Sequence, residues 1–229
     1  MGEKKKKETA MKMVNKVIIV SACVLFVVLM IVSGMGSSWL IMFTSVRPGD
    51  SVVIDYTLFD AAGKPIVTSE KIIYDQTLAQ GRDIFVSKQL TITSNRTMEN
   101  PIYAVPVYSS TGADVQQLAI FSLEYNAISS GIIGMKVNEQ KRIALSSGIP
   151  MTHELSVEQL ALSKINLTDI SLGDNFFMGI SDNSEEVTNS TTANTYLRIG
   201  EVANKYPDGI VVDLSYSMVD VRVVSINNR

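Results

Sequence analysis

The side chains that most often carry chemistry are scarce in this 229-residue chain. His153 is the only histidine, so a zinc site, a haem ligand pair or a serine–histidine–aspartate triad would depend on that one imidazole. It lies between Thr152 and Glu154 in a loop-like stretch, where we expect an ordinary solvated side chain. Cys23 is the only cysteine and can form neither an intrachain disulfide nor a thiolate metal cluster. We therefore expect no metal and no cofactor.

Three carboxylates recur with a regular spacing. Asp50, Asp55 and Asp60 stand five residues apart. No cation-binding loop has this period, and we expect solvated carboxylates at all three positions.

Three sequons for glycosylation begin at Asn95, Asn166 and Asn189. Such short motifs also arise by chance, so they are informative only together with a signal for export. Small exported domains usually contain disulfides. Their absence suits a prokaryotic envelope better than a eukaryotic secretory route.

Residues 17–43 supply that signal, because none of these 27 residues is charged. A spanning helix needs about 20 apolar residues, since its backbone amides must be paired inside the helix. Six lysines precede the stretch, within residues 1–16, and the next lysine is Lys64. This bias predicts a basic cytoplasmic tail (1–16), a transmembrane anchor (17–43) and an extracytoplasmic remainder. A cleaved signal peptide and lipidation at Cys23 are the alternatives, although a signal peptide's apolar region is shorter.

The formal charge of −3 hides an asymmetry. The basic tail carries +4, so the rest of the chain carries −7. An acidic exported domain repels polynucleotides, and we expect no nucleic-acid partner.

The elements expected after the anchor are mostly short strands, together with one or two short helices. Residues 126–135 favour a helix because Ile128, Ile132 and Met135 fall on one helical face. A second helix is expected at 156–162, and a polar loop at 181–193. Strands are expected at 51–59, 66–68, 84–93, 102–108, 118–123, 141–145, 195–202, 209–214 and 219–226. The predicted fold class is α+β, mostly β.

Two segments resemble FKBP-type peptidyl-prolyl isomerases. Residues 46–57, VRPGDSVVIDYT, are similar to the family's opening GD-x-V-x-V-x-Y-T strand, and residues 131–142 are similar to its G-L-x-G-M-K-V-G-E-K-R segment. Residues 172–177, 199–202 and 211–213 resemble, in the right order, the flap inserted in SlyD-type members. Anchored proteins of this kind are similar to ones found in archaea.

The resemblance implies a curved antiparallel sheet around a short helix, formed by residues 46–148 and 216–229, with a flap lobe at 149–215. Residues 70–120 are longer than the family's connection at that point and are not placed by it.

The resemblance also implies an apolar pocket that binds a prolyl ring and twists its amide, whose rotational barrier is about 20 kcal/mol. Carried over singly, the catalytic positions are Tyr56, Ile66, Val67 and Ile128. The substrate-binding positions are Phe121, Tyr125 and Val219. Val67 stands where the family has aspartate, Ile66 where it has phenylalanine, and the tyrosine of the A-Y-G loop has no clear counterpart.

Three functions follow from these expectations. The first is a membrane-tethered prolyl isomerase and chaperone, with full or weakened isomerase activity, whose partners are unfolded or proline-containing polypeptides. The second is a non-catalytic peptide- or protein-binding module of the same fold. The third is a structural envelope protein.

Overall fold

The computed structural model describes residues 2–34, 44–109, 115–145, 151–181 and 194–227. The chain divides into two compact units, residues 1–44 and 45–229. The predicted glycosylation site at Asn189 and the expected polar loop, except for Ser181, lie outside the described residues.

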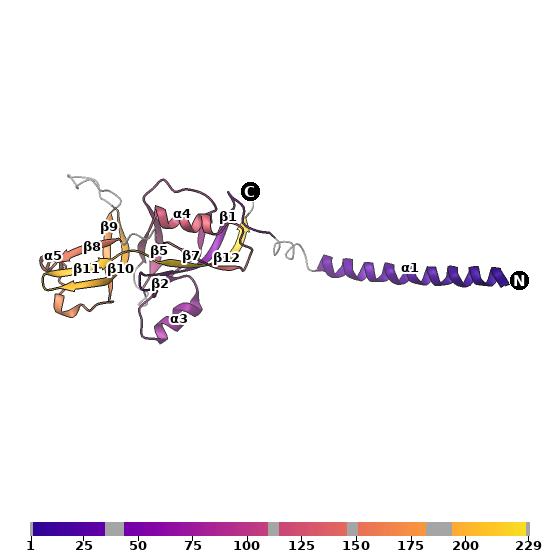
Figure 1. The fold of residues 1–229 in the computed structure, drawn as a ribbon, viewed down its shortest axis with the longest axis horizontal. Helices are drawn as coiled ribbons and strands as arrows, with labels where there is room; N and C mark the ends of the chain where they lie inside the picture. Colours follow the sequence, from indigo (N-terminus) through magenta and orange to yellow (C-terminus); the bar gives the residue numbers. More distant parts are fainter. Residues whose placement is uncertain (1, 35–43, 110–114, 146–150, 182–193, 228–229) are drawn as a thin grey trace. The chain divides into compact units, whose positions relative to one another are not determined.

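The first unit contains the long helix α1 (Gly2–Gly34), drawn in indigo in Figure 1. Its large apolar side chains at 17–20 and 24–31 are all exposed, and such runs of consecutive positions reach every side of a helix. Among the helices of the described residues, none is both long and apolar enough to cross a membrane. Residues 35–43 of the predicted anchor lie outside the described residues.

The second unit is mostly β, which confirms the predicted fold class at that level. Its helices are α3 (Lys71–Ala79), α4 (Ser122–Gly131) and α5 (Val157–Leu162), with a 3₁₀ turn at Leu167–Asp169. Its strands are β1 (Ser51–Phe59), β2 (Pro65–Thr68), β3 (Phe85–Ser87), β4 (Leu90–Thr93), β5 (Ile102–Tyr108), β6 (Val115–Phe121), β7 (Gln140–Ala144), β8 (Thr152–Ser156), β9 (Asn175–Ser181), β10 (Thr195–Tyr206), β11 (Gly209–Asp213) and β12 (Met218–Asn227).

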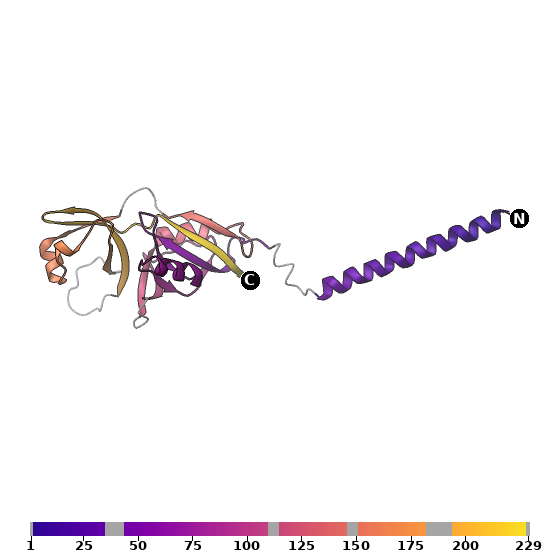
Figure 2. The same cartoon turned by 90° about the horizontal axis from the view of Figure 1, so that it is seen from below.

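The described strands form one sheet in the order β7-β12-β1-β2-β3-β5-β6-β10-β11-β8, with β4 paired to β1 and β9 paired to β10. In Figures 1 and 2, α4 and α3 lie on opposite sides of the β1–β12 part of the sheet. Strands that are far apart in sequence are neighbours in this sheet, because the C-terminal β12 pairs with every residue of β1.

Alternating apolar residues of β1 build the main core. Ile54, Tyr56 and Leu58 are completely buried. Leu58 is paired with Val67 of β2 on one side and with Val219 of β12 on the other, so these three side chains share one face of the sheet. The observed bounds of β1 are those that the sequence pattern predicts.

Helix α4 begins and ends four residues earlier than the pattern of apolar residues predicted. The Glu124 carboxylate accepts a hydrogen bond from the Phe121 N–H at 2.9 Å, which satisfies an amide that the first helical turn leaves free. The strand expected to run to residue 123 therefore ends at Phe121. The shift still leaves Ile128 and Ile132 buried in the main core.

Residues 70–120, which the family pattern did not place, belong to the same sheet. The strand expected at 84–93 is two strands, because β3 pairs in parallel with β2 whereas β4 pairs with β1. The hairpin β5–β6 supplies four buried side chains to the main core: Val105, Val107, Leu118 and Ile120. This segment is therefore a structural part of the domain.

A second, smaller core lies in the lobe that contains β8, β9, β10, β11 and α5. Its buried residues are Leu160, Ile170, Val202, Ile210 and Val212. Helix α5 follows the predicted N-cap, where the Ser156 hydroxyl accepts a hydrogen bond from the Gln159 N–H at 3.3 Å. The flap boundaries at 149 and 215 stay a prediction.

Arg198 of β10 connects this lobe to the main core. Its guanidinium is completely buried and donates to the Glu124 carboxylate of α4, to the carbonyl of Ala119 at 2.8 Å and to that of Leu214 at 2.7 Å. It also lies 3.5 Å from the centre of the Tyr216 ring. A buried cation satisfied by three segments fixes the position of all three relative to each other.

Candidate functional site

Most of the residues predicted for a prolyl pocket lie inside the main core. Tyr125 is also buried, and Phe121 is partly buried. The core cluster brings together Tyr125 and five residues that are each at most 2% exposed: Tyr56, Ile66, Val67, Ile128 and Val219. Of the seven, only Tyr125 lines any of the surface cavities described below.

The Tyr56 phenol is enclosed rather than presented to a ligand. Burial raises its pKa well above the ordinary value, and the nearby hydroxyl of Ser87 offsets part of that rise. The two hydroxyls nevertheless lie outside hydrogen-bonding geometry, and neither has a partner among the described residues. This environment is that of a core tyrosine.

The β5–β6 hairpin contributes to the same core as this tyrosine. Tyr103 of β5 packs against the main core and lies against Tyr125, with 4.9 Å between the ring centres. Four further side chains of the hairpin are buried in the same cluster. The predicted residues and the hairpin side chains are therefore packed together in one core.

The regularly spaced carboxylates are structural, and the expectation of solvated side chains is wrong for two of them. Asp55 is buried and accepts hydrogen bonds from Arg222 at 2.7 Å and from Gln89 at 3.0 Å. Asp60 is buried and accepts one from the Lys64 N–H at 2.7 Å in the β1–β2 turn. Burial is also the main cause that raises the pKa of Asp60.

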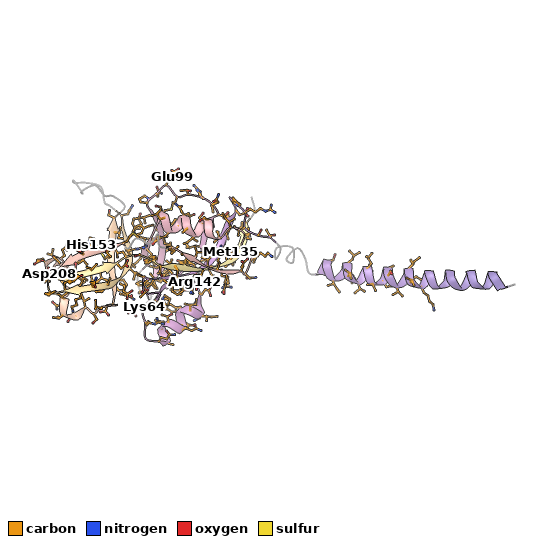
Figure 3. All side chains as sticks on the ribbon, in the orientation of Figure 1. Lys64, Glu99, Met135, Arg142, His153 and Asp208 are labelled. Atoms are coloured by element: carbon orange, nitrogen blue, oxygen red, sulfur yellow. The ribbon has the colours of Figure 1, made fainter. Side chains whose placement is uncertain are left out.

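The single histidine is exposed, as expected, although it lies in β8 rather than in a loop. Figure 3 labels it in the lobe. Among the described residues, no group of three or more histidine, cysteine, aspartate or glutamate side chains could hold a metal ion. Asn95 and Asn166 are both exposed, which sequons require.

An open groove lies at the junction of the hairpin and the lobe. We call it the β9 groove, and it encloses about 630 Å³. No residue that lines it is charged. The side chains used below are Phe85, Val115, Phe177, Gly179, Thr195 and Leu197.

Strand β9 forms one wall of this groove and is an edge of the sheet. Among the described strands it pairs only with β10, where Gly179 lies opposite Leu197. Phe177 is 51% exposed and meets the Phe85 ring edge to face, with 5.8 Å between the ring centres. A Cβ atom on Gly179 would come within 2.8 Å of the Thr195 methyl group, so a larger residue at this position would have to displace the Thr195 side chain.

Sequence reasoning did not identify this groove. The resemblance to the flap implied a strand within residues 172–177, but the pattern of the residues themselves predicted no strand at 175–181. The available signal was the sequence NFFMGIS, in which Phe176, Met178 and Ile180 are apolar at every second position and no residue is charged or proline. Such a segment is typical of an edge strand without the residues that normally prevent pairing.

A scan against models of known protein families and a search of curated proteins found no match to this chain. Membership of the FKBP-type family therefore stays a prediction that depends on the sequence segments quoted above.

Proposed function

We propose that this protein is a membrane-tethered, exported module that binds extended, uncharged polypeptide segments in the β9 groove. The single observation that carries the proposal is an exposed, uncharged edge strand beside an apolar groove. An extended segment that joins a sheet edge gains main-chain hydrogen bonds, and adjacent pockets select its alternate side chains.

The groove fits this mode of binding. Phe177 and Val115 are each more than half exposed, so a bound segment would bury apolar surface that water now covers. An uncharged lining disfavours charged residues in the segment, because a charge without a partner is costly to bury. Unfolded regions of exported proteins contain such segments.

The tether is proposed from the sequence of residues 17–43 and from the lysine bias before it. A helix whose apolar side chains are exposed on all sides needs an apolar environment around it. The proposed orientation keeps residues 1–16 in the cytoplasm and residues 45–229 outside.

Prolyl isomerisation, the first function implied by the resemblance, stays a prediction. The burial of Tyr56, Val67 and Ile128 gives it no support, since none of them lines a described cavity that a prolyl ring could enter. A binding module needs no such cavity and is the function that this geometry favours.

The test uses the full chain in lipid nanodiscs and a fluorescent peptide of alternating valine and threonine. Phe177→Asp places a charge in the groove and removes about half of a phenylalanine surface, which corresponds to about 2 kcal/mol or a roughly 30-fold loss of affinity. Leu162→Asp is the matched control, because Leu162 is 85% exposed in the same lobe but does not line the groove. Its affinity should equal that of the parent.

The peptide itself supplies a second control. Methylating alternate backbone nitrogens removes the donors that would pair with β9 but leaves the side chains unchanged. We expect this peptide to bind at least tenfold more weakly. Equal binding of both peptides would reject edge-strand pairing, and equal binding by the two aspartate variants would reject the groove.

A further inference from the structure

A second cavity opens beside helix α4, at the end of the hairpin opposite the β9 groove. It encloses about 330 Å³ and is lined by residues 96–100, by Tyr103 of β5 and by Tyr125 of α4. We call it the tyrosine notch. Its two rings are tilted by 42° to each other and form one continuous aromatic wall. Figure 3 labels Glu99 on the loop next to α4.

The loop that forms the opposite wall is held in place by its backbone. The Arg96 N–H donates to the Ser129 hydroxyl at 2.9 Å, and the Met98 N–H donates to the Asn126 side-chain carbonyl at 2.9 Å. The Asn95 N–H donates to the Ser129 carbonyl at 3.0 Å. These bonds to α4 form the notch before any ligand arrives, which lowers the entropic cost of binding.

The polar side chains of the notch are not used elsewhere. Arg96, Glu99 and Asn100 form no side-chain hydrogen bond or ion pair within the described part of the chain. Together they offer a cation, an anion and an amide beside an aromatic wall. A ligand with one net charge would meet a like charge in Arg96 or Glu99. A neutral ligand with many hydroxyl groups would use all three, because each hydroxyl both donates and accepts.

We propose that the tyrosine notch is a saccharide-binding site. The C–H face of a pyranose ring packs on the tyrosine rings, and its hydroxyls bond to Arg96, Glu99 and Asn100. The nearest source is the chain itself, since the predicted glycosylation site Asn95 directly precedes the loop, is exposed and has a positive φ of 55° that turns the chain there. The site is separate from the β9 groove and does not depend on the function proposed for it.

The first experiment uses the full, unglycosylated chain in nanodiscs and a panel of N-acetylglucosamine, diacetylchitobiose, glucose and galactose, followed by saturation-transfer NMR. We expect millimolar binding of at least one sugar. Glu99→Ala combined with Asn100→Ala should weaken it at least tenfold, and both positions are exposed, so folding is not at risk. Glu154→Ala with Asn204→Ala is the matched control in the lobe and should change nothing.

The second experiment identifies the source of the sugar. The chain is produced in a host that glycosylates sequons, with and without Asn95→Gln, which removes the attachment site but no residue that lines the notch. If the attached glycan occupies the notch, the glycosylated chain rejects added sugar and Asn95→Gln restores binding. Equal binding by both forms supports a site for the glycan of another molecule.

Two outcomes overturn the proposal. One is the absence of any response from the unglycosylated chain and from Asn95→Gln at millimolar sugar. The other is binding of a proline-containing tetrapeptide in place of the sugars, with loss of that binding in the Glu99 and Asn100 variant, which would make the notch a peptide site.

Discussion

The buried guanidinium of Arg198 should account for a large part of the stability of the unit formed by residues 45–229. Arg198→Met keeps the apolar stem, but it leaves the Glu124 carboxylate, whose side chain is 4% exposed, without its cation. It also leaves the carbonyls of Ala119 and Leu214 without these donors. Removing one partner of a buried ion pair costs about 3–5 kcal/mol, whereas a domain is stable by about 5–15 kcal/mol. The variant should therefore lose at least about a fifth of its stability.

Urea unfolding followed by pulse proteolysis of the full chain in nanodiscs measures this loss. Arg142→Met is the control, because its ion pair with Asp220 is exposed and is expected to contribute less than about 1 kcal/mol. Glu124→Gln keeps an acceptor for the first turn of α4 but removes the charge. Its combination with Arg198→Met should cost less than the sum of the two single changes. Simple additivity, or equal losses in Arg198→Met and Arg142→Met, would refute the reasoning.

Three further predictions concern single positions. Burial raises the pKa of the Asp60 carboxyl in the folded protein, so stability is lost as the pH rises from the ordinary pKa of aspartate through this raised pKa. Asp60→Asn should therefore raise the melting temperature at pH 7 but not at pH 3. Gly209→Ala would place a Cβ atom against the Leu155 carbonyl oxygen and push β8 away from β11. The free energy of unfolding in urea should fall by at least about 2 kcal/mol, and a change below about 0.5 kcal/mol would contradict this contact. A prolyl-isomerisation assay of the parent should show no detectable acceleration. Tyr56→Phe should change the free energy of unfolding by less than about 1 kcal/mol, because the Tyr56 hydroxyl has no partner among the described residues. Rapid isomerisation by the parent that Tyr56→Phe abolishes would contradict the interpretation of Tyr56 as a core residue.

Two strands of the main core, β1 and β5, could be predicted because each has a local signal. In β1, apolar and β-branched residues precede a glycine turn at Gly63, whose φ is +78°. Strand β5 was predicted with its exact bounds, since Asn100-Pro101 marks its start. The start of α4 was missed because its N-terminal signal is Glu124, which acts through a backbone contact and not through an apolar period.

The connections between distant segments had no local signal. Nothing in the sequence of residues 70–120 indicates that β3 pairs with β2 while β4 pairs with β1. Arg198 stands between Leu197 and Ile199 and reads as the polar face of a strand, yet it is one of the largest fully buried side chains. Its burial becomes understandable only when Glu124, 74 residues away, is placed beside it.

The same long-range packing explains why the candidate sites are formed by other residues than those that the family resemblance indicated. A pocket formed by Tyr56, Val67 and Ile128 remains open only if nothing nearby has apolar surface to bury, and the β5–β6 hairpin has four such side chains. Burying them stabilises the domain by about 1.5–3 kcal/mol each, which is more than an empty apolar pocket contributes. The packed hairpin therefore leaves Tyr56, Val67 and Ile128 inside the core, and two surfaces for recognition lie at its ends, the β9 groove at one and the tyrosine notch at the other.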